Sequence, residues 1–469
     1  MPLSTLRHER LLAANRNEYG PACDRLRWVT PQEAAAAERR RQALLDDLAG
    51  RAATVCAGTK LDGRRLSPGC TACTRGSWSC LFISGRCNCR CFYCPSEQDG
   101  SLVPTTNAVP FAKSGDYVDY LRRFGFTGAS ISGGEPLLTL EASLRFVRAV
   151  KQAFGPAVHV WLYTNGTLAS AEALGRLRAA GLDEIRFDIG ATGLSLEAAR
   201  RAVGLIDTVT VEIPALPEAF EAMKERIRAM AEAGIDHLNL HQLRLTPYNL
   251  PRMADRGYTF LHGEAVTVLE SELAALELIR WSLDQGIDLP INYCSFVYKH
   301  RFQRMAARRR SAALARKPWE DVTASGYLRT LCLEGPPEAL ARAVQPVEAA
   351  GESGWRWATT ARDRLEAGAA VWSRVDLSPF EASLRYAEAV ILPAPSYHHV
   401  FETIPLNRKR RLVVEKVPRG DRFRLPPGLR EPLRALAAGL PAPAAPPDDP
   451  LWDRILSHEV LEAGLGDYF

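Results

Sequence analysis

Three closely spaced cysteines lie in one short segment of the chain. Cys87, Cys91 and Cys94 form a Cys-x3-Cys-x2-Cys pattern, with the aromatic Tyr93 directly before the last cysteine. Three thiolates on one loop can bind three irons of a [4Fe–4S] cube, whereas an electron-transfer cluster normally uses four. The fourth iron then keeps an open position, which a catalytic metal site needs in order to bind substrate. The spacing therefore predicts a catalytic iron–sulfur cluster.

A second motif, Gly133-Gly134-Glu135-Pro136, follows an apolar run about forty residues further on. The two glycines allow the backbone to approach a ligand closely. Glu135 offers a carboxylate that can accept hydrogen bonds from an ammonium group. The alternative interpretation of this segment is an ordinary turn between a strand and a helix.

Strands that alternate with amphipathic helices are expected from Trp78 onward. A partial (β/α)6 barrel with a parallel sheet, an α/β fold, is the predicted architecture. The expected strands cover residues 78–84, 127–132, 158–163, 184–189, 208–213 and 237–243, and a helix over 264–285 and a strand over 287–293 extend this core. The carboxyl ends of parallel strands share one rim, where active sites of βα barrels gather. The cysteine motif follows the first strand and Gly-Gly-Glu-Pro follows the second, so both are expected at that rim.

Two further polar residues end predicted strands of the same series. Asn165 ends the third strand, in a Thr-Asn-Gly segment, and Asp188 ends the fourth. A plain Asn-Gly turn is the alternative for Asn165, and a helix cap or local turn is the alternative for Asp188. Both residues are nevertheless candidates for the site at the rim.

Together, the cysteine motif and the Gly-Gly-Glu-Pro motif resemble the radical S-adenosylmethionine (SAM) superfamily. In that superfamily the unique iron binds the amine and carboxylate of SAM. One electron from the cluster splits the S–C5′ bond, and the resulting 5′-deoxyadenosyl radical abstracts a hydrogen atom from the substrate. The resemblance implies an iron–sulfur oxidoreductase whose partners are SAM and a one-electron donor such as flavodoxin or ferredoxin.

The same resemblance suggests a role for each motif residue. The cluster ligands would be Cys87, Cys91 and Cys94, and Tyr93 would pack near the adenine. The residues that would contact SAM are Gly133, Gly134, Glu135 and Pro136 at its amino group, Asn165 at its ribose or carboxylate, and Asp188 at the same rim. Segments 66–70, 78–83, 237–240 and 292–295 look like an uncharacterised branch related to pyruvate formate-lyase activating enzymes. This likeness names no substrate; a peptide or a small metabolite is favoured.

A second group of cysteines surrounds the first motif in the sequence. Its members are Cys56, Cys70, Cys73, Cys80 and, much later in the chain, Cys294. An auxiliary iron–sulfur cluster is the preferred interpretation, with structural zinc and unliganded thiols as alternatives. Either Cys56 or Cys294 could complete such a site. Cys89 lies inside the first motif at the wrong spacing and is interpreted as a bystander or a regulatory thiol.

A competing interpretation is a zinc ribbon in a non-catalytic protein that binds nucleic acid. Cys70 and Cys73 are separated from Cys91 and Cys94 by seventeen residues, which suits such a module. It explains neither Cys87 nor the Gly-Gly-Glu-Pro motif. A disulfide framework is disfavoured because eight of the eleven cysteines crowd into residues 56–94. This clustering points to metal in a reducing compartment.

Composition places further limits on function. The chain has 469 residues and is 46% hydrophobic, but it has no apolar run long enough to span a membrane and no signal-peptide pattern at residues 1–20. A cytoplasmic protein is therefore expected. Basic runs at 301–317 and 408–411 are interpreted as solvated surfaces, with a phosphate-bearing substrate such as RNA as the alternative. Nucleic acid is not favoured, because no recognisable RNA-binding module accompanies the basic runs.

The predicted domain organisation has four parts. Residues 1–77 form a helical and Cys-rich extension, with a helix over 30–53 and an irregular segment over 56–77. Residues 78–300 form the barrel core, and 301–439 form a small α+β domain with strands at 372–377, 386–392 and 411–417. Residues 440–469 hold a Pro-rich linker (440–450) and a terminal helix.

Overall fold

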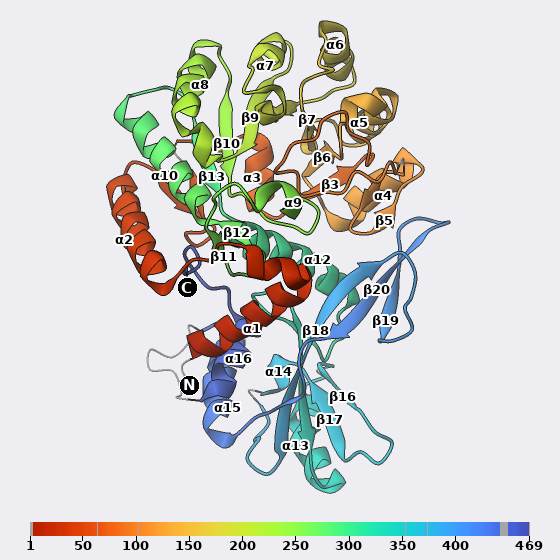
Figure 1. Ribbon diagram of the computed structural model, residues 1–469. Coiled ribbons are helices and arrows are strands. Elements are labelled where there is room, and N and C mark those ends of the chain that lie inside the picture. The colour runs from red at the N-terminus through yellow and green to blue at the C-terminus, as the bar shows by residue number, and fades with distance from the viewer. Residues whose placement is uncertain are drawn as a thin grey trace. The chain divides into compact units, whose positions relative to one another are not determined.

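The computed structural model describes residues 3–62, 64–101, 103–351, 353–372, 374–440 and 449–468. The chain divides into two compact units (Figure 1). Unit 1 comprises Met1–Thr106, Pro110–Gln303 and Ala463–Phe469, and unit 2 comprises Asn107–Val109 and Arg304–Glu462. Both sequence motifs belong to unit 1.

Seven parallel strands form the centre of the unit 1 sheet. Their spatial order is β13-β10-β9-β8-β7-β6-β3, and every neighbouring pair is parallel. Their bounds are β3 Trp78–Phe82, β6 Gly128–Ser132, β7 His159–Thr164, β8 Glu184–Phe187, β9 Thr208–Pro214, β10 His237–His241 and β13 Ile291–Cys294. The six predicted strands and the predicted seventh are thus all present. The fold is α/β with the parallel sheet of a partial barrel, as predicted.

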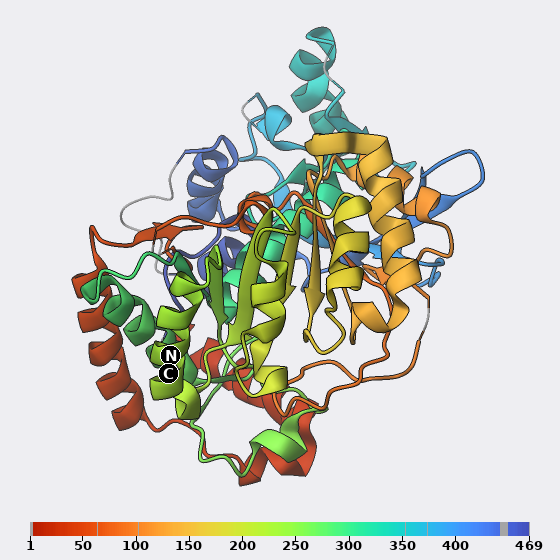
Figure 2. The same cartoon turned by 90° about the horizontal axis from the view of Figure 1, so that it is seen from above.

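Helices line one face of this sheet because the strands alternate apolar and polar side chains. In β8, Ile185 and Phe187 are buried on one face, whereas Glu184 and Arg186 share the other. Figure 2 shows helices ranged along the yellow and green strands. The helices of this unit are α1 Leu3–Tyr19, α2 Pro31–Leu48, α3 Pro68–Thr74, α4 Ser114–Phe124, α5 Leu140–Phe154, α6 Ala171–Ala179, α7 Glu197–Ala202, α8 Phe220–Glu232, α9 Leu250–Met253, α10 Leu269–Asp284 and α11 Phe296–Tyr298.

Short strands complete unit 1 at the edges of its parallel series. Next to β13 lies β2 in antiparallel pairing, followed by β1, and β4 pairs with β3 at the other side. These edge strands are β1 Ala53–Val55, β2 Lys60–Asp62, β4 Thr105–Thr106 and β5 Val109–Pro110. Two other short strands, β11 Phe260–Leu261 and β12 Thr267–Val268, pair with each other in a separate sheet. β2 therefore brings the N-terminal Cys-rich segment beside the last parallel strand.

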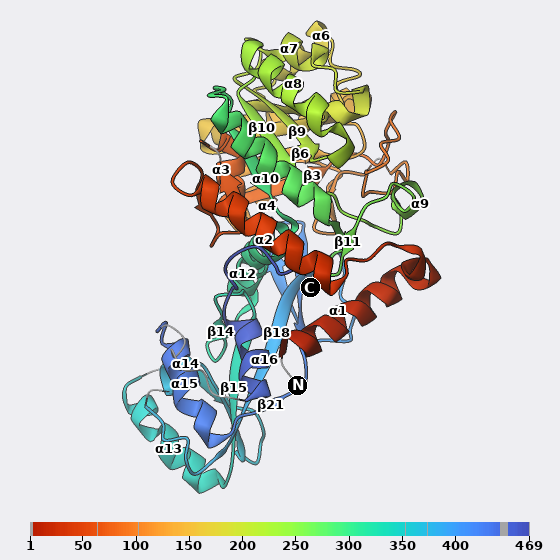
Figure 3. The same ribbon diagram turned by 60° about the vertical axis from the view of Figure 1, so that its left-hand side comes forward.

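The helix α2 begins where the sequence indicates. Thr30 accepts a hydrogen bond from the Glu33 backbone, and the Glu33 side chain accepts one from the Thr30 N–H, which together form a capping box. Helix α2 lies alongside α10, as Figure 3 shows. Within the described residues, no helix has the length and apolarity that crossing a membrane requires.

Unit 2 is built on an antiparallel sheet. Its main strand order is β16-β17-β15-β18-β20-β19, with β14 beside β15 and β21 beside β18. The strands are β14 Asp321–Val322, β15 Leu328–Glu334, β16 Trp355–Trp357, β17 Arg364–Ala367, β18 Glu381–Leu392, β19 Phe401–Pro405, β20 Arg411–Pro418 and β21 Phe423–Arg424. The helices are α12 Arg304–Ala315, α13 Pro337–Ala349, α14 Ala369–Trp372, α15 Pro427–Ala437 and α16 Pro450–Glu459. Helices and strands of this unit share one hydrophobic core, which includes Trp372 and Trp452. The unit is therefore of the α+β class.

Three local predictions were wrong. Residues 56–77, expected to be irregular, contain β2 and α3, and α3 begins because the Ser67 hydroxyl accepts a hydrogen bond from the Cys70 N–H. Of the strand predicted at 372–377, the described residues 372 and 374–377 form no strand; α14 ends at Trp372, whose apolar neighbours pack into the unit 2 core instead. Strand β13 begins only at Ile291, after Pro290, which has no N–H for the ladder. Of the predicted Pro-rich linker, residues 441–448 lie outside the described residues.

Candidate functional site

The three motif cysteines follow strand β3 on one loop at the carboxyl rim of the sheet. Cys87, Cys91 and Cys94 are all partly exposed, and none is in a disulfide. The Cys89 N–H lies 3.4 Å from Cys87 Sγ, and Arg252 donates a hydrogen bond to the Cys91 carbonyl at 3.3 Å. Burial raises the pKa of the Cys91 thiol to about 12, and the negative charge of Asp188 adds to this. A bare thiolate at Cys91 is therefore disfavoured, whereas bound iron would stabilise it.

The Gly-Gly-Glu-Pro motif holds the start of this loop. The Gly134 N–H donates to the Ser84 carbonyl at 2.8 Å, and the Glu135 N–H donates to the Arg86 carbonyl at 2.7 Å. A Cβ at Gly134 would overlap the carbonyl of Arg86, and Gly133 has a φ of 150° that disfavours other residues. In the structure, both glycines permit close approach of backbone to the cysteine loop.

Glu135 binds the end of the neighbouring strand. Its carboxylate is fully buried and accepts hydrogen bonds from the Asn165 N–H at 2.7 Å, the Thr164 hydroxyl at 2.8 Å and the Leu137 N–H at 2.9 Å. Burial raises the pKa of this carboxyl, although the three donors oppose the rise. The residue therefore connects the motif after β6 to the end of β7.

Asn165 in turn reaches the cysteine loop. Its side-chain N–H group donates to Asn88 Oδ1 at 2.8 Å and lies 3.9 Å from Cys87 Sγ. Its Oδ1 accepts from the Thr167 N–H at 3.0 Å. Glu135, Asn165 and Cys87 thus form one connected series, in which the ends of three parallel strands meet.

Tyr93 and Asp188 form a second contact at the rim. The Tyr93 hydroxyl donates to Asp188 Oδ1 at 2.7 Å, and the Gly190 N–H donates to the same oxygen at 3.1 Å. Burial raises the pKa of Asp188 to about 6, although the hydrogen bond from Tyr93 favours the ionised form. The tyrosine, whose ring is buried, is thereby fixed between the last cysteine and the end of β8.

Sequence reasoning missed residues that hold this arrangement. Asn249 donates to the Tyr93 carbonyl at 3.1 Å, and a side chain at Gly190 would overlap the Tyr93 hydroxyl. Thr164 supplies one of the three donors to Glu135. The Thr-Asn-Gly segment was a visible signal for Thr164, but Asn249 lies in a loop whose proximity to Tyr93 only folding creates.

Cysteines of the second group gather at the other end of the parallel series. Cys294 ends β13, and its Sγ lies 2.6 Å from Nζ of Lys60, the residue opposite it on β2. On α3, Cys73 Sγ is 3.0 Å from the Tyr298 hydroxyl and Cys70 Sγ is 3.3 Å from Asn239 Nδ2. Cys56 directly follows β1, which pairs with β2 through Val55 and Lys60. Cys80 instead lies on β3, beside Ser130 of β6.

Buried charges anchor α3 against the sheet. Arg186 lies between Glu184 and Glu212, each at 2.7 Å, and all three belong to β8 and β9. The Gly69 N–H at the start of α3 donates to Glu184 Oε2 at 3.0 Å, and Arg186 donates to Ser67 Oγ at 3.2 Å. The start of α3, and with it Cys70, is therefore fixed against the polar face of the sheet.

The donor sets fit iron–sulfur clusters better than a single ion. In the part of the chain that the structure describes, no three Cys, His, Asp or Glu side chains are arranged to hold a metal ion as they stand. A single zinc ion needs its sulfurs about 3.8 Å apart, since each lies about 2.3 Å from the ion. A cube spreads its thiolates over different irons. Nor does the structure group Cys70 and Cys73 with Cys91 and Cys94, as the zinc-ribbon hypothesis required.

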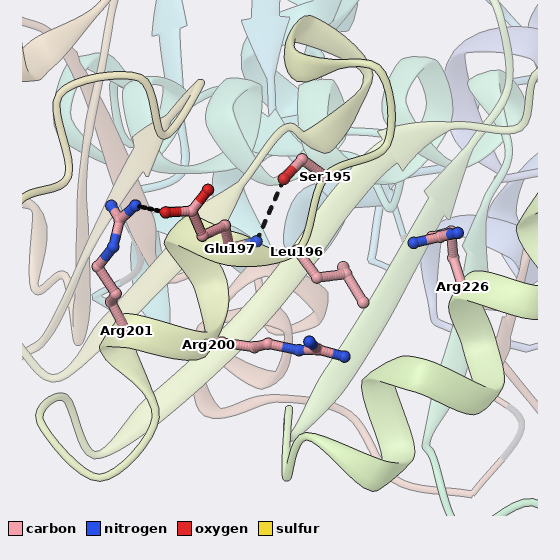
Figure 4. A pocket seen from close by; sticks show the side chains of 6 residues that line it. All are labelled: Ser195, Leu196, Glu197, Arg200, Arg201 and Arg226. Carbon is pink, nitrogen blue, oxygen red and sulfur yellow. Dashed lines mark hydrogen bonds and ion pairs between the residues drawn. The ribbon is translucent and has the colours of Figure 1, made fainter.

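A surface hollow lies away from these motifs. Its volume is about 450 Å³, and its lining is Ser195, Leu196, Glu197, Arg200, Arg201 and Arg226. Figure 4 shows Leu196 between Arg200 of α7 and Arg226 of α8, while Arg201 is ion-paired with Glu197. None of the motif residues lines this hollow, so it is not the site of the predicted chemistry.

Comparison with known proteins gives consistent matches. Residues 81–204 match the model of the Radical SAM superfamily. Over 282 residues the chain is 31% identical to a Methanocaldococcus jannaschii protein named "Putative glycyl-radical enzyme activating enzyme", covering 56% of this chain and 72% of that protein. It is also 31% identical over 210 residues to a GTP 3′,8-cyclase of Rhodopirellula baltica, covering 45% of this chain and 48% of the cyclase.

Solved structures show a slighter likeness. The crystal structure of Streptococcus suis SuiB bound to S-adenosylmethionine aligns with a TM-score of 0.35 at 13% identity. The alignment covers 47% of this chain and 50% of SuiB. The chain therefore spans about half the length of SuiB and of the cyclase, and more of the Methanocaldococcus protein.

Proposed function

The chain belongs to the radical SAM superfamily, and on this premise we propose that it cleaves SAM reductively at a [4Fe–4S] cluster held by Cys87, Cys91 and Cys94. When bound, the cluster and SAM supply one-electron chemistry that yields a 5′-deoxyadenosyl radical for hydrogen abstraction from a substrate. The observation that carries the proposal is the attachment of the cysteine loop to the Gly-Gly-Glu-Pro motif at the rim of the parallel sheet.

The residues around the loop would act by holding it in place. Gly134 and Glu135 bind its first residues through their backbone N–H groups. The Glu135 carboxylate fixes Asn165, whose side chain reaches Asn88 and Cys87. With all of its strong hydrogen bonds made inside the protein, Glu135 acts here as a positioning residue, and any contact with the SAM ammonium would be additional.

Tyr93 and Asp188 would shape the adjoining side of the SAM site. The hydrogen bond between them holds the tyrosine ring in a buried position beside the cysteine loop. Contacts of Tyr93 with the adenine, and of Asn165 and Asp188 with SAM, are part of the proposal. Each residue lies on or after the end of a parallel strand, where a ligand at the rim can be reached.

We further propose a peptide or small-metabolite substrate and a one-electron donor such as flavodoxin or ferredoxin. The relative named as a glycyl-radical enzyme activating enzyme, matched over 72% of its length, makes a polypeptide the first class to test. Because another relative is a GTP 3′,8-cyclase, a small molecule is the second class of substrate to test. A second metal centre, made from the other group of cysteines, completes the proposal.

Formation of 5′-deoxyadenosine tests this function. Protein reconstituted anaerobically with iron and sulfide is incubated with dithionite and SAM, and 5′-deoxyadenosine and methionine are measured by mass spectrometry. We expect product from the wild type and none above background from Cys91→Ala. Cys89→Ala, a change in the same loop at a position outside the ligand spacing, should retain activity. Equal product from wild type and Cys91→Ala would refute the proposal.

A further inference from the structure

Four cysteines from three distant parts of the chain converge beside strand β13. Cys56 follows β1, Cys70 and Cys73 lie on α3, and Cys294 ends β13. Strand pairing supports this convergence. Lys60 of β2 lies opposite Val55, the residue before Cys56, and it also lies opposite Cys294. We call Cys56, Cys70, Cys73 and Cys294 the four-thiol group. Cys80 is outside it, since β3 lies at the opposite end of the parallel strand order from β13.

A buried lysine accompanies the four-thiol group. Lys60 is 1% exposed, and its ammonium contacts only neutral or sulfur atoms among its hydrogen-bond partners, Asn292 Oδ1 and Cys294 Sγ. A buried cation requires a nearby anion. Thiolates, or a cluster that carries negative charge through them, would provide that anion.

Other donors also face the sulfurs. Gln303 donates a hydrogen bond to Cys73 Sγ at 2.9 Å, and the Tyr298 hydroxyl lies 3.0 Å from the same atom. The amide of Asn239 donates to Cys70 Sγ at 3.3 Å. With Lys60 at Cys294, three of the four sulfurs thus have an N–H or O–H group directed at them. Hydrogen bonds to sulfur are a feature of iron–sulfur sites and help to set their reduction potential.

We propose that the four-thiol group holds a second, fully protein-ligated [4Fe–4S] cluster, with Lys60 as its buried counter-ion. This assignment rests on the second metal centre proposed above and names its ligands and type. Iron and sulfide must be supplied for assembly, and the four thiols lose their protons as four Fe–S bonds form. Four thiolates leave no open iron position, so the cluster would carry electrons and would not bind SAM. Zinc is disfavoured because the thiols are not grouped at single-ion spacing.

Metal analysis in a chain without the loop cluster tests the assignment. In the Cys87→Ala/Cys91→Ala/Cys94→Ala triple variant, we expect about four irons per chain after anaerobic reconstitution, against about eight in the wild type. Adding Cys70→Ala/Cys73→Ala should remove the remaining iron. Adding Cys80→Ala instead should leave it, which provides a matched control. Circular dichroism establishes that each variant is folded, and Cys294→Ala replaces the double change if that variant does not fold.

Each other outcome overturns the assignment. About one zinc and no iron in the triple variant would make the site a structural zinc centre. The absence of bound metal from the folded triple variant would show unliganded thiols. Because the triple variant cannot cleave SAM by the proposed mechanism, its iron content is independent of that activity. A failure of SAM cleavage in the wild type therefore remains distinguishable from a failure of the second cluster.

The role of Lys60 has a separate readout. Lys60→Met keeps the length of the side chain and removes its charge. In the triple-variant background, we expect unchanged iron content and a more negative midpoint potential in a redox titration followed by electron paramagnetic resonance, because a buried cation favours the reduced, more negative cluster. An unchanged potential with unchanged iron would refute the role of the lysine as counter-ion.

Discussion

The two groups of cysteines in this protein are built in opposite ways. The proposed ligands on the first loop, Cys87, Cys91 and Cys94, fall within eight residues and are partly exposed. The four-thiol group draws on residues from Cys56 to Cys294 and lies beside a buried lysine that contacts Cys294. One site is local in sequence and needs the fold only to hold its loop. The other exists only after β2, α3 and β13 have come together.

This difference suggests different roles for the two sites. A loop with three thiols leaves one iron open for SAM, and the rim of the sheet gives a ligand access. A buried site with four thiols and its own counter-ion is suited to electron transfer and to linking distant segments. Changes that affect one site and spare the other test this difference.

The largest expected effect follows from Gly134→Ala. The added Cβ would overlap the Arg86 carbonyl and lie near the Cys87 N–H, and neither backbone group can move without displacing the loop. We expect 5′-deoxyadenosine formation to fall to background and about half of the iron to be lost. Gly175→Ala in helix α6, where a Cβ meets open space, is the control and should retain activity and iron. Full activity of Gly134→Ala would show that the contact does not position the loop.

Removal of metal should affect stability unequally. Metal at the four-thiol group connects three segments, so its binding free energy contributes to folding. We expect Cys70→Ala/Cys73→Ala to lower Tm by roughly 5–10 °C relative to the reconstituted wild type. The triple variant of the loop should change Tm by no more than about 2 °C. Differential scanning fluorimetry under anaerobic conditions measures both, and the reverse order would contradict the comparison.

Glu135→Gln tests the internal support of the loop site. The carboxylate accepts three hydrogen bonds, and an amide in its place would present N–H donors to at least one of them. A buried donor left without an acceptor costs about 1–3 kcal/mol, so urea unfolding should show a loss of that size. SAM binding should weaken as well, while iron at the four-thiol group stays. Stability equal to the wild type would show that the network rearranges without cost.

The smallest predicted effect is a pH dependence at Asp188. Its pKa is raised from 3.8 to about 6 by burial, so the protonated side chain suits the folded state better than the ionised one. Its stabilising contribution is complete below pH 3.8 and is lost as pH rises through about 6. Between pH 4.5 and 7.5 the wild type should lose about 2 kcal/mol relative to Asp188→Asn. Urea unfolding across this range measures the difference, and a constant difference would refute the raised pKa.

Local patterns made much of the fold predictable. Alternation of strands with helices located all seven parallel strands, and the order of the motifs placed them at one rim. The errors arose where packing decided the structure. The apolar residues around Trp372 predict a strand, but their side chains pack into the core of unit 2. Ser67 was a helix-cap signal that the surrounding Gly, Pro and Cys residues obscured.

The sequence predicts the residues of one candidate site more completely than those of the other. Spacing alone predicts the loop cysteines as cluster ligands, because all three lie within one short segment of the sequence. It could not choose between Cys56 and Cys294 for the second site, since only strand pairing brings both beside Lys60. Lys60 itself carries no signal in the sequence: a lysine is ordinarily exposed, and its burial depends on residues more than two hundred positions away.

Electron paramagnetic resonance of the dithionite-reduced protein, with and without SAM, tests the division between the two sites most directly. In the wild type, we expect signals from two reduced clusters, of which SAM changes one. The Cys87→Ala/Cys91→Ala/Cys94→Ala variant should keep only a signal that SAM leaves unchanged. A silent triple variant, or a remaining signal that responds to SAM, would contradict the account.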